Sequence, residues 1–169
     1  FLVINKPMGL VVHPGSGNRD GTLANGLVAR YPEIKKVGED PLRPGIVHRL
    51  DKETAGIMLV ARTTIGYEHL KRQFKSRQIE KTYLALVEGV TKVDRGVIEG
   101  FMKRSPQVPI KRELRDDETG KFSKTIYRVL KKTADRTLVE ANPQTGRMHQ
   151  IRVHFASLGH PIVGDALYG

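Results

Sequence analysis

The sequence contains no cysteine and no long apolar run, and both absences restrict what the protein can be. Without cysteine, the 169 residues can form no disulfide, cysteine nucleophile or thiolate metal site. No run of roughly 18 apolar residues occurs, so the sequence predicts no membrane-spanning helix, and its first residues lack the pattern of a signal peptide. A reducing compartment fits these features, and we expect a cytoplasmic protein without a membrane partner.

Positive charge, in contrast, is abundant. The chain has 29 Lys and Arg residues against 18 Asp and Glu residues, a formal net charge of +11. This excess on a chain long enough for one domain with a core favours a polyanionic partner, nucleic acid first. Basic proteins that bind no nucleic acid, and proteins of ribosomes or membrane surfaces, have the same balance.

The apolar pattern predicts an α+β fold, in which a mainly antiparallel sheet forms the core and helices flank it, because many strand-like segments are interspersed with few helices. The polar segments 33–45 and 103–122 are expected to be loops, as is 13–18. We expect strands at residues 1–5, 57–61, 81–88, 96–101, 124–131 and 136–141, and helices at 22–31, 63–77 and 149–158.

The last of these helices is expected to begin near His149. Ile151, Phe155 and Leu158 then fall on one apolar face, and Gly159 ends the helix. Arg152 lies off that face, and the simplest interpretation of it is a surface arginine.

One stretch has an unusual mixture of charges directly before a predicted strand. Asp51 lies among His48, Arg49 and Lys52, and the apolar residues 57–61 follow. Loops at the rim of a sheet commonly hold reactive side chains, and the neighbouring positive charges favour the ionised carboxylate. Such an aspartate can be a nucleophile or a general base. Taken alone, however, a loop salt bridge or a helix cap is the simpler interpretation.

The full string favours the catalytic interpretation of Asp51 over the structural one, because it resembles the signature H-R-L-D-x-x-T-x-G of the RluA/RluD family of pseudouridine synthases. The resemblance implies that Asp51 is the catalytic residue and that Arg49, with His48, helps to displace the target base. The string in this chain is His48-Arg49-Leu50-Asp51-Lys52-Glu53-Thr54-Ala55-Gly56.

Two further motifs resemble the same family. Lys81-Thr82-Tyr83 is similar to its second motif, which implies that Tyr83 packs on the target base and that Lys81 contacts RNA. Residues 146–154 are similar to its third motif, which implies that Arg152 pairs with Asp51 and that Arg147 contacts RNA.

The resemblance extends over essentially the whole chain and is greatest to the RluD branch, given His13-Pro14-Gly15 and Gly17-Asn18. It implies that residues 1–169 are a single catalytic domain with the pseudouridine synthase fold. Because the sequence starts at Phe1 inside an apolar run, we interpret it as part of a longer chain, and it contains no S4-type RNA-binding domain. Met148 and Ala55 differ from the residues that are common in the family, but neither position is expected to carry chemistry.

The chemistry implied by the resemblance breaks the N1–C1′ bond of uridine and forms a C5–C1′ bond. The base must first leave the RNA stack, and stacking on Tyr83 would contribute roughly 1–3 kcal/mol. A carboxylate beside C1′ can stabilise charge on the sugar, attack it, or remove the C2′ proton, and the sequence does not choose among these. No cofactor is expected, and His48 and His149 lack further ligands at the spacing of a metal site.

We therefore expect a monomeric enzyme that isomerises uridine to pseudouridine in structured RNA. Large-subunit ribosomal RNA is the first candidate substrate, and tRNA is the alternative. A catalytically silent RNA-binding domain of the same fold, acting in ribosome assembly, is the second hypothesis. An aspartate-dependent glycosidase is a third, but no second carboxylic acid is evident as a partner for Asp51.

Overall fold

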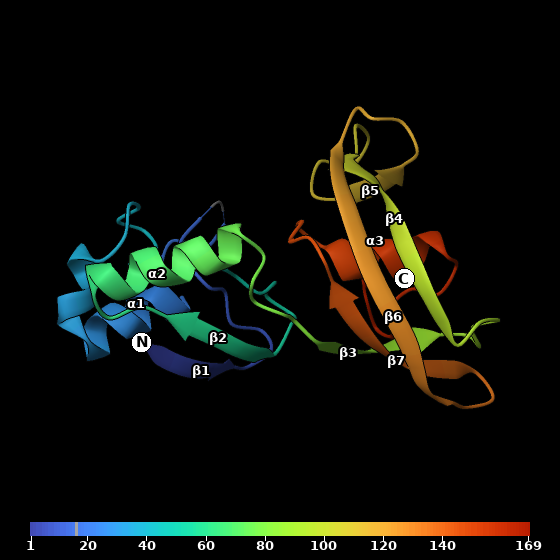
Figure 1. Cartoon of the computed structure of the whole chain (residues 1–169), viewed down its shortest axis with the longest axis horizontal. Coiled ribbons are helices and arrows are strands. Elements are labelled where there is room, and N and C mark those ends of the chain that lie inside the picture. The colour runs from blue at the N-terminus through green and yellow to red at the C-terminus, as the bar shows by residue number, and fades with distance from the viewer. Residues whose placement is uncertain (16) are drawn as a thin grey trace. The chain divides into compact units, whose positions relative to one another are not determined.

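A computed structural model of the chain describes residues 1–15 and 17–169. Ser16, within the loop expected at 13–18, lies outside the described residues. Internal contacts divide the chain into two compact units, Phe1–Ile79 and Glu80–Gly169, which are described separately (Figure 1). Within the described residues, antiparallel sheets and three α-helices confirm the predicted α+β class.

The first unit contains a two-stranded antiparallel sheet and two α-helices. In the sheet, Leu2 lies opposite Val60, and Lys6 lies opposite Gly56. The first α-helix begins after Thr22, whose side chain accepts a hydrogen bond from the backbone N–H of Asn25 in a capping box. The elements are β1 (Leu2–Lys6), α1 (Leu23–Arg30), the 3-10 helix η1 (Pro32–Lys36), β2 (Gly56–Val60) and α2 (Thr64–Lys75).

The alternation of side chains along β1 places a lysine in the core of this unit. Leu2, Ile4 and Lys6 point to the inner face, where Met58 and Val60 of β2 are fully buried. Lys6 is as inaccessible to solvent as these apolar neighbours. A buried ammonium group needs hydrogen-bond partners, and Lys6 finds two in the segment directly after β1 and one in the loop that carries Asp51.

The second unit is a five-stranded antiparallel sheet with one helix. Its strand order is β3-β7-β6-β4-β5, so the first strand in the sequence pairs with the last. A β-bulge interrupts the pairing of β6 with β7 between Val129 and Lys131. The elements are β3 (Tyr83–Glu88), β4 (Arg95–Arg104), β5 (Arg112–Arg115), β6 (Lys121–Lys132), β7 (Arg136–Pro143) and α3 (Gln150–Ser157).

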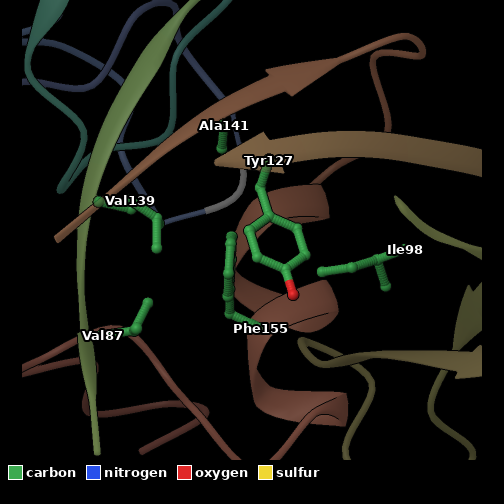
Figure 2. Packing of buried hydrophobic residues seen from close by; sticks show 7 residues of the cluster. Val87, Ile98, Tyr127, Val139, Ala141 and Phe155 are labelled. Carbon is green, nitrogen blue, oxygen red and sulfur yellow. The ribbon is translucent and has the colours of Figure 1, made fainter. Parts of the chain in front are cut away.

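Helix α3 packs its buried face on this sheet. Phe155 is fully buried, and its ring meets that of Tyr127 edge to face with 5.3 Å between the centroids (Figure 2). At the end of the helix, Gly159 adopts a φ of 77° and the Gly159 and His160 N–H groups form the hydrogen bonds of a Schellman motif. The core cluster consists of Ala85, Val87, Ile98, Tyr127, Val139, Ala141 and Phe155.

Three details of the prediction were wrong. Leu158, expected on the apolar face of the last helix, is 46% exposed because the chain reverses at Gly159 directly after it. The segment expected to be a loop at 33–45 begins with the end of the 3-10 helix η1. Strand β5 lies inside the hairpin expected to be a loop, where pairing of Met102 with Leu114 orders a mostly charged segment.

The residues after α3 cover the outer edge of β3. Val163 donates a backbone hydrogen bond to Leu86, and Glu88 donates one to Pro161. A bridge between Val87 and Ile162 extends this contact. The C-terminal segment is therefore part of the second unit rather than a loose end.

Candidate active site

The loop that carries Asp51 is fixed by its backbone. Leu50 is buried directly before it, and the carbonyl of Asp51 accepts a hydrogen bond from the N–H of Thr54, which closes a turn. The carbonyl of Lys52 accepts a second one from the N–H of Gly9, at 2.9 Å. Asp51 therefore projects from an ordered turn directly before β2, and its side chain is partly exposed.

Lys6 is the centre of this arrangement. Its ammonium group donates to the carbonyls of Pro7 and Leu10, both at 2.9 Å, and to that of Lys52 at 3.1 Å. All three donors of the group are thereby used. Burial lowers the pKa of Lys6, while the negative charges of Glu53 and Asp51 act against this shift. Lys6 thus connects β1 to the turn that holds the predicted catalytic carboxylate.

Arg49 lies two residues before Asp51 and is exposed. Its Nη1 is 3.3 Å from Nε2 of His13. The Nδ1 of His13 is 3.0 Å from the carbonyl of Pro14, which can only accept, so Nδ1 carries the proton and Nε2 accepts from Arg49. His13 therefore orients the arginine that we expect to displace the target base.

His48 connects this loop to two neighbouring elements. Its Nε2 accepts a hydrogen bond from the backbone N–H of Leu59 in β2, at 2.9 Å. Its ring stacks on Phe74 of α2 with 4.4 Å between the centroids. These contacts give His48 a structural role, and its expected contact with RNA stays a prediction.

In the second unit, Gln150 organises the segment expected to form the third motif. Its side-chain carbonyl accepts hydrogen bonds from Thr145 Oγ1 and Arg147 N, and its amide donates to Lys124 O and Thr125 Oγ1. Gln150 is buried, and these bonds satisfy its amide group. The turn before α3 is therefore tied to β6.

Arg147 and Arg152 are both held by partners in the second unit. The Nε of Arg147 donates to the carbonyl of Phe122 at 2.9 Å. Arg152 forms two hydrogen bonds with Asp165, of 2.6 Å from Nε and 2.7 Å from Nη2. The expected pairing of Arg152 with Asp51 stays a prediction.

Tyr83 occupies the first position of β3. Tyr83, Ala85 and Val87 alternate along the strand and therefore point to one face of the sheet. Phe155 of α3 belongs to the same buried cluster as Ala85 and Val87. Lys81 precedes the strand, and its carbonyl accepts a hydrogen bond from the side-chain amide of Asn142.

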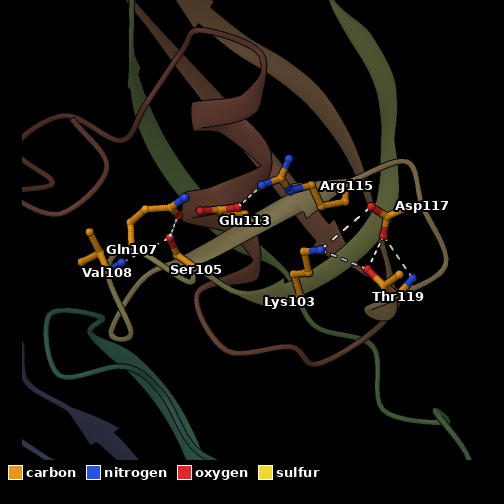
Figure 3. Close-up of polar contacts among 8 residues, drawn as sticks. All are labelled: Lys103, Ser105, Gln107, Val108, Glu113, Arg115, Asp117 and Thr119. Carbon is orange, nitrogen blue, oxygen red and sulfur yellow. Dashed lines mark hydrogen bonds and ion pairs between the residues drawn. The ribbon is translucent and has the colours of Figure 1, made fainter.

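Two pairs of opposite charges lie on the hairpin between β4 and β6 (Figure 3). Lys103 Nζ donates to Thr119 Oγ1 at 3.1 Å and lies 3.9 Å from Asp117. Arg115 donates to Glu113 at 2.6 Å. Hydrogen bonding lowers the pKa of Glu113, with Ser105 as the larger cause and Arg115 as the second.

Neither a metal cluster nor a membrane helix is found in the described part of the chain. Within it, no group of three or more His, Cys, Asp and Glu side chains is placed to hold a metal ion. Across residues 1–15 and 17–169, no helix is long and apolar enough to cross a membrane.

The profile of the RNA pseudouridylate synthase family matches residues 1–157, which include Asp51, Tyr83 and Arg152. The chain belongs to this family, as its resemblance to the RluA/RluD signature indicated.

Individual relatives agree with the assignment. "Ribosomal large subunit pseudouridine synthase D" of Xylella fastidiosa is 48% identical over 168 residues, covering 99% of this chain and 49% of the relative. An uncharacterized RNA pseudouridine synthase of Aquifex aeolicus is also 48% identical, covering 100% of this chain and 53% of the relative. The chain thus spans about half the length of the curated relatives that it matches.

The fold is also that of a solved family member. Human RNA Pseudouridylate Synthase Domain Containing 1 superposes with a TM-score of 0.78 at 31% sequence identity. The match covers 99% of this chain and 65% of the human chain. The predicted pseudouridine synthase fold is confirmed.

The predicted site residues are divided between the units. His48, Arg49 and Asp51 belong to the first unit. Lys81, Tyr83, Arg147 and Arg152 belong to the second.

Sequence reasoning missed Lys6, Gln150 and Asp165 as supports of this site. A signal existed for Lys6, because the period of two along β1 places it on the inner face with Leu2 and Ile4. Asp165 and Gln150 gave no such periodic signal, since Asp165 binds Arg152 of α3 and Gln150 binds Lys124 and Thr125 of β6 as well as the turn before α3.

Proposed function

We propose that this chain isomerises uridine to pseudouridine in structured RNA, with large-subunit ribosomal RNA as the substrate. The observation that carries the proposal is the ordered turn of Asp51, placed directly before β2 within the segment that matches the family. The printed name of the Xylella fastidiosa relative supports the choice of RNA. The N1–C1′ bond breaks, the base turns, C5 bonds to C1′, and the proton lost from C5 is balanced by one gained at N1.

Asp51 is the residue proposed to act at the sugar. Its carboxylate, beside C1′, either attacks the sugar or takes the C2′ proton, and each role requires an ionised and fixed aspartate. The turn closed by Thr54 and the hydrogen bond from Lys6 to the carbonyl of Lys52 support such a fixed position. Neither role could be performed by a loosely held side chain at a useful rate.

The other residues are proposed to handle the RNA. Arg49, held by His13, displaces the target base, since a guanidinium plane can stack like a base. Tyr83 stacks on the extruded uracil, and Arg152 pairs with Asp51. We further propose that His48, Lys81 and Arg147 contact the RNA near the target.

The reaction is proposed to need no metal or organic cofactor, because the uracil leaves and returns within one site and no electrons are transferred. Activity should therefore survive exhaustive dialysis against EDTA, measured on an RNA that remains folded in monovalent salt. Loss of turnover that a single added metal restores would contradict this. We also propose that the protein acts as a monomer in the cytoplasm.

The test of the function is pseudouridine formation on large-subunit ribosomal RNA transcribed in vitro. Carbodiimide labelling followed by reverse transcription maps each new pseudouridine. The wild-type chain should modify defined uridines, and Asp51→Asn should form no product while its Kd for the RNA stays within about threefold. Asp20→Asn, at an exposed aspartate of the same unit, is the matched control and should keep full activity.

This experiment also distinguishes an enzyme from a catalytically silent RNA-binding domain of the same fold. A wild-type chain that binds the RNA but forms no pseudouridine on ribosomal RNA or tRNA would favour the silent domain. Equal turnover by wild type and Asp51→Asn would instead remove Asp51 from the chemistry.

A further inference from the structure

The pair of Arg152 with Asp165 lies beyond what the family match explains, because the match ends at residue 157. Nε and Nη2 of Arg152 donate to Oδ2 and Oδ1 of Asp165 in a bidentate pair. The Asp165 side chain is 4% exposed and that of Arg152 22%. A paired charge this well covered holds its geometry better than an exposed one.

Asp165 is itself held in place by the backbone around it. Its Oδ1 accepts hydrogen bonds from the N–H groups of Leu167 at 3.0 Å and Tyr168 at 3.2 Å. Burial raises the pKa of Asp165, but the hydrogen bonds from Arg152 and from these two N–H groups together hold it below the ordinary value. The carboxylate is therefore ionised at neutral pH and fixed relative to the C-terminal turn.

Tyr168 constrains the plane of the same guanidinium. The guanidinium carbon of Arg152 lies 5.0 Å from the centroid of the Tyr168 ring. The hydroxyl of Tyr168 accepts a hydrogen bond from the backbone N–H of Arg112 at 2.8 Å and lies 2.9 Å from Nδ1 of His149. His149 adopts a φ of 59° at the start of α3, a strained conformation that this contact supports.

We propose that Asp165 is a positioning residue, which with Tyr168 aims the guanidinium of Arg152 at its partner in the reaction. The proposal deepens and rests on the proposed function, in which that partner is Asp51. A guanidinium has five N–H donors, and the fork to Asp165 takes those of one edge. The opposite edge therefore has a fixed direction, set by a buried carboxylate behind the arginine and an aromatic ring over its face.

Asp165 and Tyr168 together form what we call the clamp of Arg152, and preorganisation is the physical reason for it. An arginine side chain without support loses rotamer entropy when it is fixed, and this cost would recur in each catalytic cycle. With Asp165 in place, the ordering occurs on folding. The clamp should therefore affect the reaction step more than the binding of RNA.

A second bidentate pair in the same unit provides the comparison. Arg128 donates to both carboxylate oxygens of Glu140, at 2.8 and 2.9 Å. The Arg128 side chain is 54% exposed. Glu140→Gln makes the same chemical change as Asp165→Asn, an amide in place of a carboxylate facing arginine, at a residue that has no role in the proposed machinery and alternates along β7 with the buried Ala141.

The decisive variant is Asp165→Asn. The asparagine oxygen can still accept from Leu167, Tyr168 and Nη2 of Arg152, so the turn is kept, but its amide nitrogen now faces the Nε–H of Arg152, and the fork is lost. The single-turnover rate at saturating ribosomal RNA should fall between about 10-fold and 100-fold, with Kd within about threefold of wild type. The rate of Asp165→Glu, which keeps a carboxylate, should lie between those of wild type and Asp165→Asn. The rate of Glu140→Gln should equal that of wild type.

A structural role alone predicts a different pattern. If Asp165 acts through Arg152, adding Asp165→Asn to Arg152→Lys should slow the reaction little further, whereas two independent effects would multiply. In NMR spectra, the Arg152 Nε–H resonance, assigned by its loss in Arg152→Lys, should exchange slowly in wild type and rapidly in Asp165→Asn.

The outcomes separate the two levels of the proposal. An active wild type with Asp165→Asn at the same rate overturns the clamp and leaves the function intact. A protected Nε–H in a chain that forms no pseudouridine overturns the function instead, and keeps the clamp as a structural finding. If Asp165→Asn does not fold, as judged by thermal unfolding, Asp165→Glu decides, and a wild-type rate in that variant counts against the clamp.

Discussion

Nζ of Lys6 donates a hydrogen bond to the carbonyl of Lys52, the residue that follows Asp51, at 3.1 Å. The same carbonyl accepts from the N–H of Gly9. A buried lysine thus ties the first strand to the turn of the candidate catalytic residue, and the stability of the fold depends on the same contact as the order of the site.

Lys6→Met should therefore destabilise the protein and loosen the turn. Methionine fits the volume but leaves the carbonyls of Pro7 and Leu10 without their donor, at a cost of about 2–4 kcal/mol in the free energy of unfolding. Urea unfolding measures this loss, and amide exchange at Thr54 should become faster. Lys36→Met, at an exposed lysine in η1, should change stability by less than about 0.5 kcal/mol. Equal stability of the two variants would contradict the role of Lys6.

Gly45 and Gly26 should respond in opposite directions to replacement by alanine. Gly45 has a φ of +71°, and a Cβ there would lie 2.3 Å from the carbonyl oxygen of Ala61. Gly45→Ala should cost more than about 2 kcal/mol, since it combines strain with a clash against backbone. Gly26 lies in α1 with open space around it, so Gly26→Ala should stabilise by about 0.5–1 kcal/mol. Thermal unfolding of both variants tests the pair.

Stability should fall in mild acid because of His154. This residue is fully buried in α3, its Nε2 is 2.8 Å from Ser123 Oγ, and burial lowers its pKa to about 4. Since Ser123 Oγ donates to Gly100 O, Nε2 of His154 carries the proton of the neutral ring.

The direction of this pH dependence follows from the number of protons that the folded and unfolded chains bind. Between pH 6.5 and 4 the unfolded chain binds a proton at His154 that the folded chain does not, so the free energy of unfolding decreases as pH falls. The loss attributable to this group reaches about 3 kcal/mol below pH 4. Unfolding in urea from pH 7 to 4.5 should show a steeper pH dependence in wild type than in His154→Gln. His69→Gln, at an exposed histidine of α2, should keep the wild-type slope.

Affinity for RNA should decrease steeply with salt, because phosphate contacts release counterions. We expect Arg49→Gln to reduce the slope of log Kd against log salt by about one. Lys103→Gln should leave the slope unchanged, because Lys103 is already paired with Asp117 and Thr119. A slope near zero in wild type would show that the basic surface does not dock RNA.

The period of the apolar residues was sufficient to predict most elements. The helix at 63–77 begins one residue after Thr63, which caps it, and ends at Lys75. Strand β5 could not be predicted in this way. Its residues are mostly charged, and their extended conformation comes from pairing with β4, which a local pattern does not contain.

The residues of the candidate site likewise fall into those that the sequence reveals and those that only the structure reveals. Asp51, Tyr83 and Arg152 stand in motifs whose spacing is visible in the sequence. Their supports are less visible, because Asp165 meets Arg152 only through the reversal at Gly159. A buried lysine such as Lys6 also contradicts the usual exposure of its residue type, so composition alone argues against it.

The strand order of the second unit has a consequence for the order of folding. Strands β6 and β7 are neighbours in both sequence and sheet, so their pairing closes a short loop. Strand β3, in contrast, can pair only after β7 is in place, although it precedes the other strands of this unit in the sequence. The segment with Pro161 and Val163 can then add to β3. Tyr83, at the start of β3, would thus reach its position late in folding. In pulse-labelled hydrogen exchange during refolding, the amides of β6 and β7 should become protected before those of β3.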